Sequence, residues 1–237
     1  MTVNQNQTVG EIVARDYRAA SVFRAHGIDF CCRGGRTIQD VCESKNIPVD
    51  TLLGELEEAM ASKGGEMADY STWPLDLLVD YIEKRHHRYV AEKSPELLQY
   101  LDKLCKVHGE RHPELFQIRD EFVQAAGELA AHMKKEELIL FPYVRRLATE
   151  KAPSAPPFGT VQNPINMMMH EHEVEGDRFE RISKLSNNYV PPADGCTTYR
   201  VAYALLRDFE EDLHMHIHLE NNILFPRAIE MEKSAVA

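Results

Sequence analysis

Two segments of the sequence carry the same pattern of histidine, glutamate and proline. The pattern H-x-x-x-E-x-x-I-L-F-P starts at His132 and again at His216, with six identities at matching spacing. Residues four apart in a helix lie on one face, so each segment directs an imidazole and a carboxylate, Glu136 or Glu220, to the same place. Imidazole and carboxylate together are ligands for iron, manganese or zinc. The repeat therefore predicts two similar helices that bind metal together.

Two further helices are expected to supply the remaining nitrogen ligands. Under regular helical periodicity, His86 shares its face with apolar side chains, whereas His87 shares its face with acidic ones. His172 also lies on an apolar face of its helix. We therefore expect His86 and His172 to point into the core. We expect His87 to face water, as do His214 and His218 on the last helix.

The inward residues predict a pair of metal ions. A buried carboxylate without a partner is very costly, and a metal cluster would satisfy all the inward groups at once. Two bridging carboxylates imply two ions. If each ion has about six positions, two histidines, two carboxylate oxygens and an oxo bridge leave one position open for a small ligand. This pattern favours two oxo-bridged, non-haem iron ions. The predicted ligands are His86, His132, Glu136, His172, His216 and Glu220.

A rival ligand pattern and two further carboxylates remain open. The E-x-x-H pattern of ferritin-like di-iron proteins occurs at Glu83 and Glu211, but it is absent beside His132. Glu128 lies one turn before His132, and Glu171 directly precedes the inward histidine of the third long helix. Either carboxylate is a candidate to line an access path or to accept a hydrogen bond from a ligand. A surface position is the simpler interpretation of both.

The N-terminal region contains adjacent thiols, Cys31 and Cys32, in a glycine-rich loop with Arg33 and Arg36. Nearby positive charge lowers the pKa of a thiol and makes it more reactive. A direct disulfide between adjacent cysteines is strained, so transient metal binding or thiol exchange is the expected role. Two ordinary reduced cysteines remain the alternative. Cys42 is a candidate to join this pair, although the sequence does not show where its side chain points.

Helical periodicity dominates the chain, and no strand pattern competes with it. Residues 1–65 are expected to form a small helical domain, with a linker at 62–66, and residues 66–237 an antiparallel four-helix bundle. We expect the first long helix to break near Ser94 and Pro95. The expected helices are 8–25, 37–44 and 49–61 in the small domain, and 74–91, 113–148, 164–185 and 198–231 in the bundle.

Composition excludes several classes of function. The chain of 237 residues has a net charge of −11, whereas nucleic-acid binding needs a basic face. No apolar run approaches the roughly 20 residues of a membrane span, and the N-terminus lacks a signal pattern. An odd number of cysteines, five, suits reduced thiols. We therefore expect a cytoplasmic protein that binds neither nucleic acid nor membrane.

These motifs together resemble the Repair of Iron Centres family of hemerythrin-like di-iron proteins. The N-terminal match consists of Thr8-Val-Gly-Glu-Ile-Val and His26-Gly-Ile-Asp-Phe-Cys-Cys-Arg-Gly-Gly. The C-terminal match consists of His86, His132-x-x-x-Glu136, Glu171-His172 and His216-x-x-x-Glu220-Asn-Asn-Ile-Leu-Phe-Pro. The resemblance implies an all-α, hemerythrin-like antiparallel four-helix bundle preceded by a cysteine-pair domain. Oxygen-carrying hemerythrins use five histidines, one glutamate and one aspartate, so the present set weakens that interpretation.

The resemblance also implies a function in the stress response. Family members restore iron-sulfur clusters damaged by nitric oxide or oxidants, and some are linked to nitric oxide binding or reduction. The expected partners are damaged or apo iron-sulfur proteins, with nitric oxide or dioxygen as the small ligand and a homodimer left open. By resemblance, Cys31 and Cys32 carry the thiol function. The alternatives are a nitric oxide reductase and a module that scavenges or senses the gas, but neither explains the cysteine-pair domain.

Overall fold

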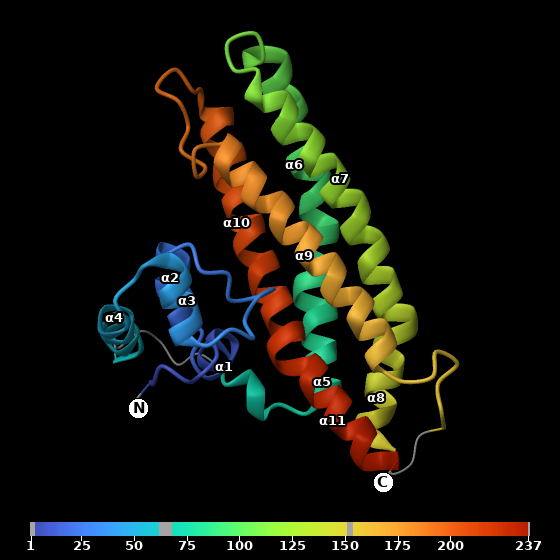
Figure 1. The fold of residues 1–237 in the computed structure, drawn as a ribbon. Coiled ribbons are helices and arrows are strands. Elements are labelled where there is room, and N and C mark those ends of the chain that lie inside the picture. The colour runs from blue at the N-terminus through green and yellow to red at the C-terminus, as the bar shows by residue number, and fades with distance from the viewer. Residues whose placement is uncertain (1–2, 62–67, 151–153, 237) are drawn as a thin grey trace.

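The computed structural model describes residues 3–61, 68–150 and 154–236, and every regular element in these ranges is helical. Four long rods run antiparallel, as Figure 1 shows. The first rod is α5 (Leu75–Tyr81), η2 (Ile82–His87) and α6 (Arg88–His108). The second is α7 (Glu114–Lys135), η3 (Glu136–Leu140) and α8 (Phe141–Thr149). The third is α9 (Gln162–Leu185), and the fourth is α10 (Thr197–Leu219), η4 (Glu220–Leu224) and α11 (Phe225–Val236). The predicted all-α bundle is confirmed.

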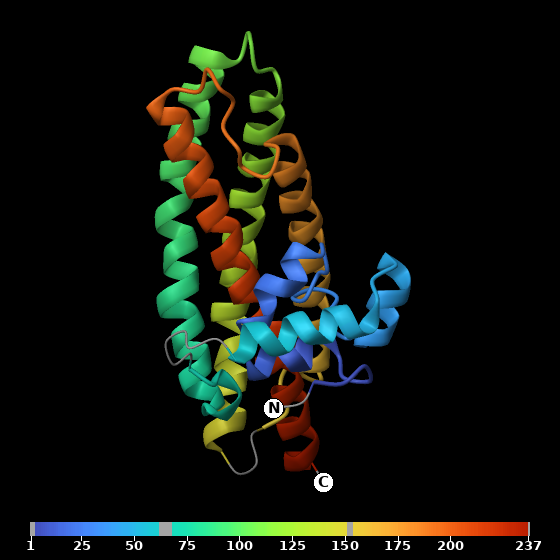
Figure 2. The same cartoon turned by 90° about the vertical axis from the view of Figure 1, so that its left-hand side faces the viewer.

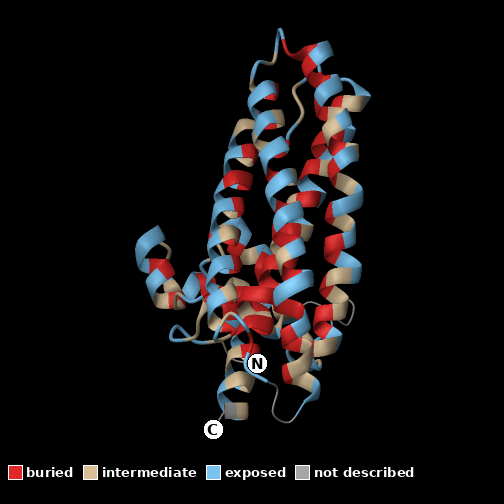
Figure 3. Cartoon of the chain, turned by 90° about the vertical axis from the view of Figure 1, so that its right-hand side faces the viewer, coloured by how far each residue is buried: buried red, intermediate tan, exposed pale blue. Residues whose placement is uncertain are grey.

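Apolar side chains fill the space between the rods. Helix α6 contacts α7 and α10, and α9 contacts the same two helices. Figure 3 shows buried residues on the inner faces and exposed residues on the outer faces. None of the described helices is both long and apolar enough to cross a membrane.

The predicted break near Ser94 and Pro95 is wrong, because α6 continues through the proline to His108. A proline inside a helix costs about 3 kcal/mol. Leu97 and Leu101, which follow it, are fully buried in the bundle, and each contributes about 2 kcal/mol. Their burial therefore outweighs the missing hydrogen bond.

Four short helices form the N-terminal unit, which lies along α10 in Figures 1 and 2. They are α1 (Val9–Arg15), α2 (Ala19–Ala25), α3 (Ile38–Lys45) and α4 (Val49–Ala61). The short η1 (Tyr70–Thr72) leads into the bundle. A capping box between Thr8 and Glu11 begins α1. The single helix expected over 8–25 is divided instead, since the Asp16 carboxylate accepts a hydrogen bond from the backbone N–H of Arg18.

The N-terminal unit shares an apolar core with the bundle. Val9 and Phe23 belong to the same cluster of buried side chains as Leu213 and Ile217 of α10. The small domain therefore docks on the bundle of its own chain. The predicted linker, 62–66, lies outside the described residues.

Candidate metal centre

Six buried side chains, with at least one from each rod, converge inside the bundle. They form two groups, and within each group one ligand atom per residue lies within 4.8 Å of the others. The first group is His87, Glu136, His216 and Glu220, and the second is His132, Glu136, His172 and Glu220. Both groups contain the same two glutamates. Carboxylates shared between two groups are placed to bridge a pair of metal ions.

Three of the rods contain a π-helical turn at this site. The turn η2 ends at His87, η3 begins at Glu136 and η4 begins at Glu220. Pro142 and Pro226 follow η3 and η4 by two residues. A proline has no N–H for the carbonyl four residues earlier, so it favours such a local change of helix geometry. The turn η2 contains no proline, and the sequence offers no comparable cause for it.

The structure contradicts the prediction that His87 faces water. His87 is 3% exposed, and its Nε2 atom lies 3.3 Å from Glu136 Oε2. A π turn holds one more residue than an α turn. Each residue that follows the extra one therefore takes the position that regular periodicity assigns to its predecessor in the sequence, so His87 takes the position predicted for His86. His86 is also buried, but its Nδ1 atom lies 3.0 Å from Asp212 Oδ2, and it belongs to neither ligand group. The structure therefore brings His87, not His86, together with the other five predicted residues.

Three of the four imidazoles bond to a second polar side chain through Nδ1. The pairs are His87 with Glu137 Oε1 at 2.8 Å, His132 with Glu171 Oε2 at 2.7 Å, and His172 with Asn221 Oδ1 at 2.9 Å. These oxygens accept the Nδ1–H, which leaves each Nε2 lone pair free to bind metal, the usual arrangement for a metal-binding histidine. His216 Nε2 lies 3.1 Å from Glu220 Oε1, and its buried Nδ1 has no partner among the described residues.

The two carboxylates singled out from the sequence lie in different surroundings. Glu171 bonds His132 and also pairs with Lys135, so it lies directly outside the ligand set. Glu128 pairs instead with Arg178, 3.1 Å away, and belongs to neither ligand group. The structure thus places Glu171, but not Glu128, beside a ligand. Sequence reasoning gave no role to Glu137 or to Asn221, whose partners lie on other helices.

Charges at the site favour cations. Burial opposes protonation of His132, but the Glu136 and Glu171 carboxylates outweigh it and raise the pKa of this histidine to about 10. Burial and the neighbouring Glu220 charge oppose ionisation of Glu136, yet its histidine neighbours hold its pKa below the usual range. The same histidine contacts hold the pKa of Glu220 well below its usual value, against the effect of burial. Both glutamates are therefore ionised in a buried place.

The pattern of unpartnered atoms fits a metal centre. Within the described residues, the buried atoms that lack a hydrogen-bond partner include His87 Nε2, both Glu136 carboxylate oxygens and Glu220 Oε2. Each such atom costs about 1–3 kcal/mol when it is left unsatisfied. His132 Nε2 and His172 Nε2 also face each other at 3.1 Å. Cations between the nitrogen and oxygen atoms would satisfy all these groups, so the residues present fit a bound metal.

The cysteine loop of the N-terminal unit lies directly against the metal centre. Asn221 Nδ2 donates to the carbonyl of Cys31 at 3.0 Å, while its Oδ1 accepts from His172. The Cys32 thiol donates to the carbonyl of His172 at 3.3 Å. Asn222 Nδ2 donates to the carbonyl of Phe30, also at 3.0 Å. Main-chain atoms of the loop therefore make most of these contacts.

The prediction that His214 and His218 face water is wrong, because the cysteine loop docks on them. His218 is 1% exposed, and His214 is half-buried. The ring of Phe30 packs on both histidines, and the ring of Tyr17 packs on His218. Burial lowers the pKa of His214 to about 4 and that of His218 to about 3. The helix face that carries them is polar in sequence because it binds another part of the chain.

The two adjacent thiols form a small group of their own. Cys31 Sγ lies 3.7 Å from Cys32 Sγ and 3.5 Å from Asp29 Oδ1, and the three residues have the geometry of a cation site. The contact with Cys32, followed by burial, raises the pKa of Cys31 well above its usual value. The expected lowering by Arg33 and Arg36 is therefore not found for Cys31.

The arginines and Cys42 are engaged elsewhere. Arg33 lies 3.6 Å from Asp177, and Arg36 Nε donates to a backbone carbonyl. Cys42 is buried in α3 and does not belong to the thiol group. The neighbouring sulfur and carboxylate thus oppose ionisation of Cys31, and both arginines bind other groups.

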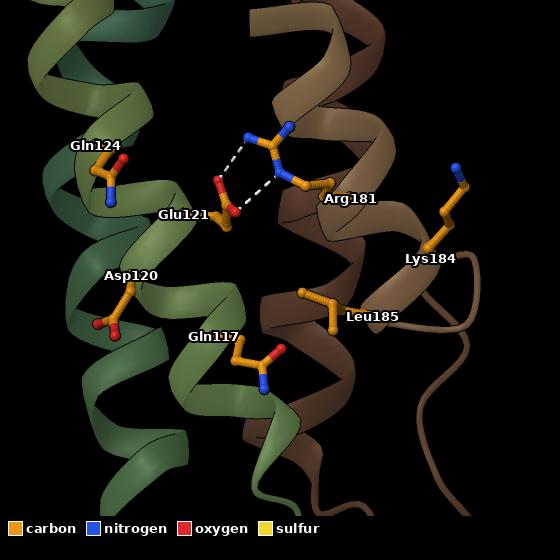
Figure 4. Close-up of a pocket in the computed structure, with 7 residues that line it drawn as sticks. All are labelled: Gln117, Asp120, Glu121, Gln124, Arg181, Lys184 and Leu185. Atoms are coloured by element: carbon orange, nitrogen blue, oxygen red, sulfur yellow. Dashed lines mark hydrogen bonds and ion pairs between the residues drawn. The ribbon is translucent and has the colours of Figure 1, made fainter.

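A surface cleft between α7 and α9 carries no comparable ligand set. Figure 4 shows that its side chains are mostly polar and that Glu121 binds Arg181 through two hydrogen bonds, of 2.9 and 3.0 Å. The lining residues are Gln117, Asp120, Glu121, Gln124, Arg181, Lys184 and Leu185. They include neither histidine nor cysteine. Among the described residues, the metal chemistry is therefore concentrated inside the bundle and at the cysteine loop.

Comparison with known proteins identifies two family domains. Residues 5–60 match the Domain of Unknown function DUF542, and residues 78–228 match the Hemerythrin HHE cation binding domain. The second match covers more than half of the chain and contains all six residues of the two ligand groups.

Relatives match almost the whole chain. The Iron-sulfur cluster repair protein YtfE of Yersinia pestis (strain Pestoides F) is 35% identical over 228 residues, which are 96% of this chain and 99% of the relative. The protein of the same name from Yersinia pseudotuberculosis serotype O:1b (strain IP 31758) is 34% identical over the same shares. The chain therefore belongs to the Repair of Iron Centres family, hemerythrin-like proteins with an N-terminal cysteine-pair domain.

Proposed function

We propose that this protein repairs iron-sulfur clusters damaged by nitrosative or oxidative stress, by donating iron to them. The main support is the position of the thiol loop, which touches His172 of the metal centre directly. A protein that only binds a gas has no need of such a loop. The relatives reported above are named for cluster repair, which favours this function over a nitric oxide reductase or sensor.

We propose that the centre holds two iron ions. His87 and His216 would hold one ion, His132 and His172 would hold the other, and Glu136 and Glu220 would contribute to both. The same glutamates belong to both ligand groups, which supports this assignment. The bound iron is the cargo, and it would supply the metal that a damaged cluster lacks. A bridging oxo group and an open position for nitric oxide or dioxygen stay predictions.

The arrangement of the residues suits release as well as binding. Glu171 and Glu137, which orient two of the ligand histidines, are partly exposed and exposed respectively, so they are open to exchange with solvent or a partner. Cys32 Sγ is also partly exposed while it contacts the main chain of His172. We infer that the thiols of Cys31 and Cys32 receive iron from the centre and present it to an apo or damaged iron-sulfur protein.

The division of labour follows the two parts of the chain. We propose that residues 1–65 are the transfer domain and that residues 66–237 are the iron-holding bundle. The two family matches fall on either side of this boundary, which supports it. We further propose that the protein works in the cytoplasm on iron-sulfur protein clients. The oligomeric state, including a homodimer, stays a prediction.

The test uses the full chain and removes only the thiols. The Cys31→Ala/Cys32→Ala variant keeps the main-chain bonds to Asn221 and to the Asp29 carboxylate. Wild type and variant are loaded with iron, mixed anaerobically with an apo iron-sulfur enzyme, and separated before iron is counted in each. We expect both proteins to load two irons and the variant to transfer at least about tenfold more slowly.

Cys42→Ala serves as the matched control because this thiol is buried in α3. It should transfer iron at the wild-type rate. Wild-type protein that keeps its iron in the presence of the apo enzyme would contradict iron donation. A double variant that transfers at the wild-type rate would contradict the role of the thiols alone.

A further inference from the structure

The thiol of Cys196 lies at the end of the bundle opposite the metal centre, where it contacts a buried histidine, His108. Cys196 Sγ is 3.2 Å from His108 Nε2, although the two residues are 88 positions apart in the sequence. They lie where α6 ends and α10 begins, at the top of Figure 1. His216 is 20 residues further along α10, which corresponds to roughly 30 Å at 1.5 Å per residue. This pair is therefore separate from the metal centre and from the loop at Cys31.

We propose that Cys196 and His108 form a reactive thiol site that exchanges with low-molecular-weight disulfides. The sulfur is at the surface, whereas the histidine is 5% exposed and its ring faces the sulfur. Its other nitrogen, Nδ1, has no hydrogen-bond partner in the described parts of the chain. Among the described residues, the sulfur is thus the one hydrogen-bonding partner of this buried ring.

Both helix ends favour charge separation between the two side chains. Cys196 is the N-cap of the 23-residue α10, where backbone N–H groups lack helical acceptors and stabilise negative charge. His108 is the last residue of the 21-residue α6, where carbonyl groups stabilise positive charge. A thiolate on Cys196 and an imidazolium on His108 therefore each lie at the favourable end of a helix.

The first turn of α10 acts directly on the thiol. The backbone N–H of Tyr199, followed by groups of Thr198, lowers the pKa of Cys196 below its usual value. Cysteines at helix N-termini or beside histidine have a larger thiolate fraction at neutral pH. For Cys42 and Cys105, by contrast, burial raises the pKa. Cys196 is therefore the more reactive thiol of these three.

Contacts with neighbouring residues fix the positions of Cys196 and His108. The rings of His112 and Tyr199 pack against His108, with centroids 6.5 and 5.4 Å away. His112 Nε2 bonds Asp194 at 3.0 Å, and Arg111 pairs with the same carboxylate at 3.0 Å. The loop before α10 is thus clamped to the loop after α6.

The chemistry is thiol–disulfide exchange. His108 accepts the thiol proton, and the thiolate sulfur of Cys196 attacks one sulfur of the disulfide. A new S–S bond forms to Cys196 as the S–S bond of the reagent breaks, and the other half leaves as a thiolate that takes up the proton. The reagent disulfide supplies the oxidising equivalents, so no further reactant is needed. The product is a mixed disulfide on the protein.

The experiment follows modification of the intact, iron-loaded protein by glutathione disulfide. Mass spectrometry of intact protein and peptides should find the first glutathione on Cys196, with the metal content unchanged. The alkylation rate of Cys196 with iodoacetamide should rise with a midpoint below the ordinary thiol value of about 8.5. Cys42 and Cys105 are internal references, and Cys196→Ser should abolish the first adduct.

His108→Gln tests the partner directly. It should raise the midpoint by about one pH unit and slow alkylation near pH 6.5 by about threefold, since the smaller thiolate fraction is partly offset by greater nucleophilicity. If this variant does not fold, the wild-type pH profile alone decides. A wild-type midpoint at or above the ordinary value, or a folded variant with an unchanged profile, would overturn the proposal.

Discussion

The two adjacent histidines of the first rod allow a sharp test of the metal centre. We expect His87→Ala to lose metal and His86→Ala to keep it. His87 Nε2 is buried without a hydrogen-bond partner and lies 3.3 Å from Glu136. His86 Nε2 also lacks a partner, but His86 belongs to neither ligand group; it bonds Asp212 through Nδ1, and its ring lies over that of His216 with centroids 5.7 Å apart. The two histidines are adjacent in the sequence, but they lie in different places relative to the ligand groups.

The expected losses of metal affinity differ between the two variants by at least an order of magnitude. Replacing an outer partner of a ligand typically lowers metal affinity 10- to 100-fold, so loss of a ligand should cost at least about 100-fold, or about 2.7 kcal/mol. His86→Ala removes one hydrogen bond, worth about 1–3 kcal/mol of folding stability, and leaves Asp212 paired with Arg85 at 3.1 Å. Its metal affinity should stay within tenfold of wild type.

The assay is anaerobic equilibrium dialysis of ferrous iron against a competing chelator, followed by metal analysis per chain. Thermal unfolding of the metal-free variants shows whether each still folds. Wild type and His86→Ala should retain two irons at a chelator concentration that strips His87→Ala. Equal retention by both variants, or loss from His86→Ala alone, would refute the assignment based on the π turn.

Three further perturbations test other parts of the structure. Glu136→Ala, and the equivalent change in the second repeat, should each remove most of the metal, because a fully buried carboxylate that both ligand groups share is lost; metal analysis decides this. Gly176→Leu should displace the cysteine loop and speed alkylation of Cys32, since a Cβ at Gly176 would lie 3.2 Å from Cys32 Sγ. Gly127→Leu is the control, because nothing lies within 4 Å of its Cβ position. Burial raises the pKa of Glu175 from 4.5 to about 7, so its protonated form stabilises the fold below about pH 4.5 and that contribution is lost as the pH rises through 7. Glu175→Gln should therefore raise the unfolding free energy at pH 8 by about 1–3 kcal/mol, and leave it unchanged at pH 4, in denaturant titrations.

Much of the bundle could be predicted because its helices follow regular periodicity. The repeated segments at His132 and His216, with their glutamates, lie where the spacing of four places them. His172 is also inward as expected, and His170 is exposed. These residues lie in, or at the edges of, regular helix, so the apolar pattern gives the correct face.

The errors have two physical causes. The choice between His86 and His87 depends on η2, a π turn that no proline or glycine marks in the sequence. The burial of His214 and His218 depends on a tertiary contact with Phe30, nearly 190 residues away in the chain. Periodicity identifies a polar helix face, but it does not distinguish a face that meets water from one that binds another domain.

The two halves of the site are similar in sequence but differ in their contact with the thiol loop. Glu137 and Asn221 follow the two glutamates that both ligand groups share, and each bonds a histidine of these groups on a neighbouring helix. The next positions differ in character. Leu138 is 75% exposed, whereas Asn222 lies against the N-terminal unit and donates to the carbonyl of Phe30. Two equivalent halves therefore build the metal centre, and the asparagine pair in one half holds the cysteines beside it. Metal binding depends on what the repeats share, and access of the thiols depends on where they differ.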